Sequence, residues 1–414
     1  MTAPDAALEH VVREEWGRLV ALLLAQFRRL DLVEDALGDA VEAASRTWPT
    51  AGVPTNPAGW LMTAAKRRVV DRLRTEAVAT RKQPLLLTDA ARHQEGARTM
   101  ADGGSLLEDD VLRLVLMCAH PALAPESATA LSLRLVLGVP TADIARLFLV
   151  PEPTMAARIT RAKKRIVGAG IPFAVPDASV LPERLDTVAQ TAYLAFTAGY
   201  SPGTGPDLLR AELSGEAIRL VRAVLSLRPD EPTLVALLAL MLLQHSRRDA
   251  RVSDGRLVLL ADQDRTRWHH DEVAEAMRLL ASSRLAGPVT PLAAAYVLQG
   301  RIAAEHATSP TAADTRWDRI IGLYDLLLQV SPSPSARLAR AVAVAEHLGP
   351  AAGLDALDGV EIPDSHRPAS VRAELLARAG DADAARAAYD QAIAACRNDV
   401  ERAFLLGRRD ELDD

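Results

Sequence analysis

Hydrophobic positions recur every three or four residues along most of the chain, which is the spacing of one face of an α-helix. In one stretch, Val33, Leu37, Ala40 and Ala44 form such a stripe. Segments in which apolar and polar residues alternate, as in a half-buried strand, are scarce. The pattern therefore predicts an all-α fold for the 414-residue chain.

Helix-breaking residues and polar stretches divide this pattern into parts. We expect a first domain at residues 1–82, interrupted by a loop from Pro49 to Pro57, then a linker at 83–105. A second helical domain follows at 106–170 and ends at Gly168, Gly170 and Pro172. The remainder, 171–414, is expected to be one helical domain. A chain of this length is too long for a single ordinary core.

The C-terminal part contains a faint repeat in which a small residue is followed by a bulky residue after four positions and an apolar residue after three more. The triplets are Ala217, Val221 and Val224; Ile320, Tyr324 and Leu327; and Ala385, Tyr389 and Ala392. The spacing resembles the second helix of a tetratricopeptide repeat. Ordinary packing of alanine-rich helices is the alternative explanation.

Composition narrows the possible functions. The formal net charge is -6, so nucleic-acid binding would depend on local basic patches. The two cysteines, Cys118 and Cys396, lie far apart, which excludes a disulfide framework. The N-terminus lacks a signal-peptide pattern, and the longest apolar run, Leu234–Leu243, is shorter than the roughly 20 residues of a membrane span. A soluble, cytoplasmic protein is expected.

The most informative stretch is TADIARLFLVPEPTMAARITRAKKR, from Thr141 to Arg165. A short helix, a turn at Val150 and Pro151, and a second helix with Pro153 in its first turn are expected. The second helix should bury a single stripe, made of Met155, Ile159, Ala162 and Ile166. This order is typical of a helix-turn-helix, which places its second helix in the major groove of DNA.

The other face of that second helix is cationic. Small Thr154 and Ala157 would allow close approach to DNA, and arginines such as Arg158 and Arg161 can donate paired hydrogen bonds to guanine. Lys163, Lys164 and Arg165 would neutralise backbone phosphates. An ordinary solvated basic face is the alternative interpretation.

Three segments together resemble a known family. TMAARITRAKKRI resembles the closing helix of sigma-factor domain four, which binds the minus-thirty-five promoter element. DLVEDALGDAVEAASRTWP, residues 31–49, resembles the polymerase-binding helix of sigma domain two, and NPAGWLMTAAKRRVVDRLR, residues 56–74, resembles the melting and minus-ten helices. The chain is thus similar, over residues 6–170, to RNA polymerase sigma factors of the extracytoplasmic-function type. Its overall plan resembles the group with a tetratricopeptide-like C-terminal extension.

The resemblance implies three sets of site residues. The set for the minus-thirty-five element is Glu152, Pro153, Thr154, Ala157, Arg158, Arg161, Lys163, Lys164 and Arg165. The set for the minus-ten element and promoter melting is Asn56, Trp60, Lys66, Arg67, Arg68, Arg72 and Arg74, although a tryptophan at position 60 is also suited to a core. Asp31, Asp35, Asp39 and Glu42 are implied to bind polymerase.

The implied partners are core RNA polymerase, through its beta-prime coiled coil and beta flap, and promoter DNA. Two positions depart from the family pattern: Gly38 stands where glutamine is usual, and Arg67 where asparagine is common. The C-terminal domain is expected to bind a protein or peptide partner or to regulate the sigma domains.

The sequence lacks motifs that mark a catalytic or metal-binding site. The sequence shows no phosphate-binding glycine loop, metal-ligand spacing or nucleophile motif, so no enzyme activity, cofactor, metal or membrane association is expected. Two other functions remain open. One is a helix-turn-helix transcription regulator with a helical sensor domain, which needs no polymerase-binding helix, and the other is a non-catalytic interaction scaffold.

Overall fold

A computed structural model describes residues 3–80, 104–148, 150–200, 211–253, 256–363 and 365–412 of the chain. Nearly all regular structure in these ranges is helical, which confirms the expected all-α class. Residue contacts divide the chain into two compact units, Met1–Leu194 and Ala195–Asp414. Within the described ranges, no helix is both long enough and apolar enough to cross a lipid bilayer.

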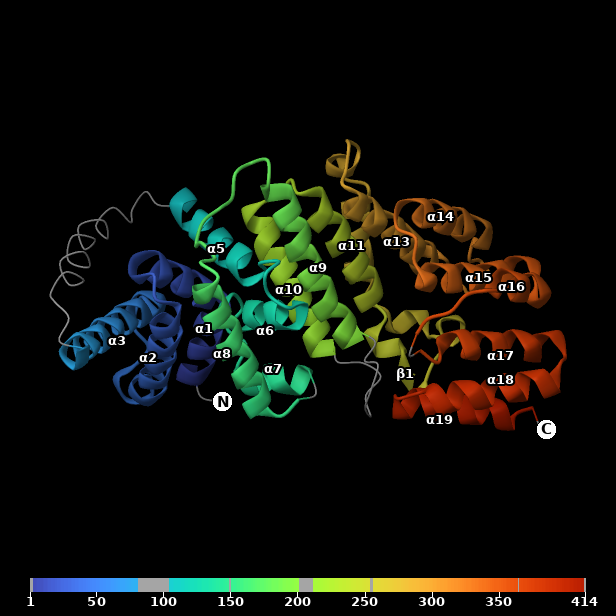
Figure 1. Cartoon of the computed structure of the whole chain (residues 1–414), viewed down its shortest axis with the longest axis horizontal. Coiled ribbons are helices and arrows are strands. Elements are labelled where there is room, and N and C mark those ends of the chain that lie inside the picture. The colour runs from blue at the N-terminus through green and yellow to red at the C-terminus, as the bar shows by residue number, and fades with distance from the viewer. Residues whose placement is uncertain are drawn as a thin grey trace. The chain divides into compact units, whose positions relative to one another are not determined.

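The N-terminal unit begins with three long helices, α1 (Ala3–Phe27), α2 (Leu30–Ala51) and α3 (Pro57–Thr80), which pack against one another (Figure 1). The stripe expected on α2 is buried, because Val33, Ala36, Leu37 and Ala44 have no exposed surface. Residues of α1 such as Val20, Ala21 and Leu23 complete this core. The periodicity of α2 thus predicted its buried face correctly.

The loop expected from Pro49 to Pro57 is shorter than the sequence suggested. Helix α2 continues through Pro49 to Ala51, and the peptide N–H of Gly52 still donates to the Trp48 carbonyl at 3.0 Å. Proline lacks an N–H and normally interrupts a helix. Here it lies in the last turn, so the one helical hydrogen bond that Pro49 cannot donate is lost close to the helix end, and only residues 52–56 connect α2 to α3.

The second helical block of this unit consists of α5 (Gly104–Cys118), α6 (Pro125–Leu135), α7 (Thr141–Leu147) and α8 (Glu152–Gly168). The expected linker at 83–105 lies almost wholly outside the described residues. Helix α9 (Leu181–Tyr200) begins in this unit, where Arg184 donates to the Leu116 carbonyl at 2.6 Å and Thr129 to the Thr191 carbonyl at 3.3 Å. The first half of α9 therefore packs with α5 and α6.

The two helical blocks of the N-terminal unit meet at a close backbone contact. A Cβ atom added at Gly17 of α1 would lie 2.3 Å from the carbonyl oxygen of Val136, just after α6. Gly138 has φ +72, and a Cβ there would lie 2.7 Å from the indole ring of Trp16. The guanidinium of Arg134 lies 5.4 Å from the same ring. Residues 3–80 and 110–170 are thus packed together.

The C-terminal unit begins with the last residues of α9, from Ala195. The helices α10 (Ala211–Leu227), α11 (Pro232–His245), α12 (His270–Leu280) and α13 (Pro291–Thr308) follow. Helix α11 is buried almost all round and packs against α10, α12 and α13. Between α11 and α12 lie a small hairpin, β1 (Val252–Ser253) and β2 (Arg256–Leu257), and the 3-10 turns η2 (Arg248–Ala250), η3 (Leu260–Asp262) and η4 (Arg265–Arg267). A further turn, η5 (Ser283–Leu285), follows α12.

The unit ends in α14 (Trp317–Val330), α15 (Pro334–Leu348), α16 (Pro350–Leu357), α17 (Arg367–Ala379), α18 (Ala382–Ala395) and α19 (Asp399–Asp410). Consecutive helices from α14 to α19 pack against each other (Figure 1). The triplets of the faint repeat face inward, because only Tyr324 among them keeps partial exposure. Burial alone suits both repeat packing and ordinary helical packing.

Candidate nucleic-acid interface

Helices α7 and α8 and the turn between them form the stretch expected to be a helix-turn-helix. Pro151 caps α8 in an extended conformation, φ -58 and ψ 143, and its carbonyl accepts from the peptide N–H of Thr154 at 2.9 Å. The predicted stripe of α8 is confirmed, since Met155, Ile159, Ala162 and Ile166 are each at most 4% exposed. These residues fix the orientation of α8 against α6 and α7.

The opposite face of α8 is open to solvent. Most of the residues assigned to the minus-thirty-five element lie there: Glu152, Pro153, Thr154, Ala157, Arg161, Lys164 and Arg165 are exposed. Arg158 is half-buried, with its guanidinium 6.0 Å from the Phe148 ring. Among the residues that the structure describes, none forms an ion pair with Arg161, Lys164 or Arg165. We call these three residues the cationic ridge; they are positioned to meet an external anion.

Lys163 lies elsewhere on the helix. Its ammonium group forms an ion pair with Glu34 of α2, and the Lys163 side chain is only 17% exposed. Arg134 of α6 donates to the other Glu34 oxygen at 2.6 Å. Burial lowers the pKa of both Lys163 and Arg134, because a charged group loses hydration there. In this arrangement Lys163 is directed toward the N-terminal helices and away from the exposed face.

The four acidic residues assigned to polymerase binding lie along α2, and their side chains are 38% to 60% exposed. Each already has a cationic neighbour in this unit. Arg29 bonds Asp31 at 2.7 Å, and this hydrogen bond lowers the pKa of Asp31. Arg72 of α3 bonds Asp39 at 2.7 Å and Asp35 at 3.3 Å, and Arg46 pairs with Glu42. The face is exposed but partly neutralised.

Helix α3 carries the residues assigned to the minus-ten element. Arg67 and Arg68 are exposed, whereas Lys66 is half-buried and its pKa is lowered by that burial. Arg72 is held by α2, as described, and Arg74 is exposed but lies 3.6 Å from Asp71. The structure therefore places the assigned basic residues on one helix, but some are exposed, one is half-buried and one is held by an ion pair with α2.

The two remaining residues of this set have structural contacts. The side-chain carbonyl of Asn56 accepts from the peptide N–H of Gly59 at 2.9 Å, so Asn56 caps the start of α3. Trp60 is half-buried and meets buried Trp48 edge to face, with ring centroids 5.7 Å apart. Trp60 thus has both a core contact and an exposed part.

The role of Glu34, which is only 5% exposed, was not predicted from the sequence. A signal was present in the helical spacing. Glu34 lies four residues after Leu30 and three before Leu37, so it falls on the apolar stripe of α2. An acidic residue within such a stripe indicates a buried cationic partner, because an unpaired buried charge is very costly.

Comparison with known proteins adds four findings. Residues 113–166 match the model of sigma-70 region 4, and residues 184–284 match a family of unknown function, DUF6596. The uncharacterized protein R00370 of Rhizobium meliloti (strain 1021) is 41% identical over 397 residues, which cover 94% of this chain and 92% of the relative. No solved structure matches the chain significantly.

Helices α6, α7 and most of α8 lie within the region 4 match. This match supports a sigma-70 family factor and implies contact with promoter DNA and RNA polymerase in general.

Proposed function

Since this chain belongs to the same family as that Rhizobium meliloti protein and carries a sigma-70 region 4, we propose that it is a sigma factor of the extracytoplasmic-function type. It binds core RNA polymerase and directs promoter-specific initiation of transcription. It acts in the cytoplasm, without enzymatic activity of its own and without a catalytic cofactor.

The cationic ridge of α8 is the observation that carries this proposal. Arg161, Lys164 and Arg165 are exposed on a helix whose other face is fixed by a buried stripe, so they enter a groove as one rigid set. In the major groove, an arginine of the second helix can donate to base edges while other cations neutralise phosphates. Thr154 and Ala157, small and exposed, allow the helix to approach the bases closely.

The acidic face of α2 is the proposed docking surface for polymerase. Cationic residues of the beta-prime coiled coil replace Arg72 at Asp35 and Asp39. The exchange leaves Arg72 available to the DNA backbone next to Arg67 and Arg68. Binding of polymerase and preparation of α3 for the minus-ten element are thus one coupled step.

Promoter binding also requires the two blocks of the N-terminal unit to separate. The two promoter elements are named for positions about 25 base pairs apart, or roughly 85 Å of B-form DNA. Helix α2, with 22 residues, is only about 33 Å long, yet Glu34 links it directly to α8. Opening breaks the pair between Glu34 and Lys163, and Lys163 then joins the cationic ridge at the DNA phosphates.

The C-terminal helices are proposed to form a tetratricopeptide-like domain that binds a protein partner or helps the sigma domains to engage polymerase. The succession of packed helices from α14 to α19 supports this assignment, and the burial of the triplets is compatible with it. Removing residues after Tyr200, which keeps the half of α9 that packs with α5 and α6, tests the role of this part in promoter-dependent transcription. Unchanged output and unchanged regulation would exclude such a role.

Polymerase binding separates this proposal from a conventional transcription regulator. We expect the full-length chain to elute with core RNA polymerase in size-exclusion chromatography as a one-to-one complex, and to bind specific promoter DNA strongly only within that complex. Tight, specific DNA binding by the chain alone, with no association with core polymerase, would favour the regulator and refute the sigma-factor proposal.

A further inference from the structure

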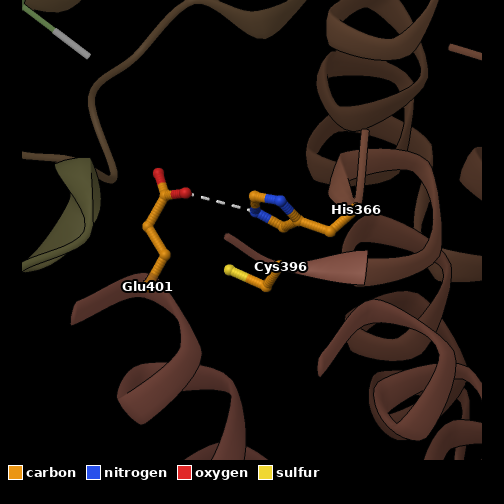
Figure 2. A group of neighbouring side chains, drawn as sticks. All are labelled: His366, Cys396 and Glu401. Carbon is orange, nitrogen blue, oxygen red and sulfur yellow. Dashed lines mark ion pairs between the residues drawn. The ribbon is translucent and has the colours of Figure 1, made fainter. Parts of the chain in front are cut away.

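Three potential metal ligands converge at the C-terminal end of the chain, outside the proposed DNA and polymerase surfaces. They are His366, which precedes α17, Cys396, which ends α18, and Glu401 in the first turn of α19 (Figure 2). Their ligand atoms all lie within 4.8 Å of one another. The imidazole Nε2 of His366 is 3.3 Å from a carboxylate oxygen of Glu401, and the thiol of Cys396 points toward the same space (Figure 2).

The chain around these ligands is held in place by its own hydrogen bonds. Asn398 is fully buried, and its side-chain oxygen accepts from the peptide N–H groups of Val400 at 3.1 Å and Glu401 at 3.0 Å. Arg402 donates to the Cys396 carbonyl at 2.7 Å. The connection between α18 and α19 therefore fixes the relative positions of the thiol and the carboxylate.

We propose that His366, Cys396 and Glu401 bind a zinc ion. A thiolate, an imidazole and a carboxylate together suit zinc, which accepts sulfur, nitrogen and oxygen ligands in tetrahedral geometry. Bonds of about 2.0 Å to nitrogen and oxygen and about 2.3 Å to sulfur place such ligands roughly 3.3–3.5 Å apart. The observed cluster thus needs only a small contraction around the ion.

The hydrogen bonds and ion pairs around these three residues are compatible with a contraction around the ion. The ion replaces the hydrogen bond between His366 and one Glu401 oxygen, while Arg367 stays near the other oxygen, at 3.8 Å, and orients the carboxylate. The Cys396 thiol, which donates to the Asn398 carbonyl at 3.4 Å, gives its proton to solvent and coordinates as thiolate. Three protein ligands leave the fourth position for water or a further ligand.

The side chains of His366 and Glu401 are 15% and 18% exposed, so an ion can enter from solvent, while Cys396 lies deeper, at 3%. A bound ion ties the ends of three helices together. The proposal does not depend on the sigma-factor assignment, since it concerns other residues and another chemistry.

Cobalt and zinc titrations of the full-length protein test the proposal. Cobalt should bind at one equivalent and give a thiolate-to-cobalt charge-transfer band in the near ultraviolet, and zinc should displace it and raise the melting temperature. Loss of a residue that supports a metal ligand typically lowers the metal affinity 10- to 100-fold, and loss of the ligand itself should lower it at least as much. Cys396→Ser and His366→Gln should therefore each raise the Kd for cobalt by about 100-fold or more. Cys118→Ala, which removes the other cysteine, should leave binding unchanged.

Glu401→Gln keeps the size of the side chain and guards against misfolded variants. It should retain the helical circular dichroism of the parent chain yet bind cobalt more weakly. Substoichiometric binding by the parent protein, a cobalt spectrum without the thiolate band, or equal affinity in the parent and Cys396→Ser proteins would overturn the zinc site and leave a simple hydrogen-bonded cluster.

Discussion

Lys163 of α8 forms an ion pair with Glu34 of α2, although the two residues are 129 positions apart in the chain. Arg134 completes the group on the other Glu34 oxygen. One carboxylate thus joins the helix proposed to bind polymerase to the helix proposed to read DNA.

Glu34→Gln should loosen the contact between the two blocks. The change removes the carboxylate charge and leaves two largely buried cations without an anion, so the free energy of unfolding should fall by about 1–3 kcal/mol. Amide hydrogen exchange in α8 should accelerate more than expected from that loss alone. Glu42→Gln, on an exposed part of the same helix, is the control and should change neither quantity. Equal effects of the two substitutions would exclude a specific role for Glu34.

Arg161→Ala and Lys164→Ala should have different effects on DNA binding by the polymerase complex. If Arg161 contacts a base edge, its loss should cost about 1–3 kcal/mol on the selected promoter and relax preference at one position. If Lys164 contacts phosphate, its loss should weaken binding uniformly and lower the salt slope by about one. Binding measured at several salt concentrations on promoter and random DNA distinguishes them. Identical profiles would contradict these separate roles.

Charge reversal at Asp35 should impair polymerase docking. Asp35→Lys replaces an exposed carboxylate of the acidic face with a cation, which repels a cationic partner and should raise the Kd for core polymerase at least tenfold, on the scale of 1.4 kcal/mol per factor of ten. The defect should be larger at low salt, where exposed charges are less screened. Glu9→Lys on α1 is an exposed control and should bind normally. Normal docking by Asp35→Lys would place the polymerase contact elsewhere.

His306 should make the C-terminal unit sensitive to acid. Burial, with Arg247 and Arg265 nearby, lowers the pKa of its imidazole to about 4, and the ring meets Trp317 at 5.2 Å. Because the pKa in the unfolded chain is near 6.5, the stabilisation is present above pH 6.5 and is lost as the pH falls toward 4. The full effect is at most about 3 kcal/mol.

Denaturation at pH 7, 6 and 5 measures this loss. His306→Gln should show a flatter pH dependence than the parent protein, and the exposed His347→Gln should not. A parallel decline in all three proteins would mean that His306 does not contribute to the acid response.

The sequence predicted features that depend on local periodicity. The stripes of α2 and α8 follow the helical repeat, so their buried residues were identifiable without tertiary information. The course of α2 through Pro49 was missed, because proline usually ends a helix, whereas here the helix continues for two residues beyond it.

Features formed between distant segments were not predictable in the same way. In the sequence, Lys163 cannot be told apart from the exposed basic residues beside it on α8. It pairs with Glu34 only because the fold brings α8 close to α2. Likewise His366, Cys396 and Glu401 lack any motif spacing, because three different helix ends bring them together. Such sites are set by tertiary structure, and the sequence alone pointed to no metal ligand.

Run-off transcription with core polymerase and genomic DNA fragments tests the central proposal most directly. We expect discrete transcripts that require the full-length chain, begin downstream of a shared pair of promoter elements, and diminish sharply with a chain carrying both Arg158→Glu and Arg161→Glu. No chain-dependent transcript from any fragment, or identical transcripts from the parent and doubly substituted chains, would contradict it.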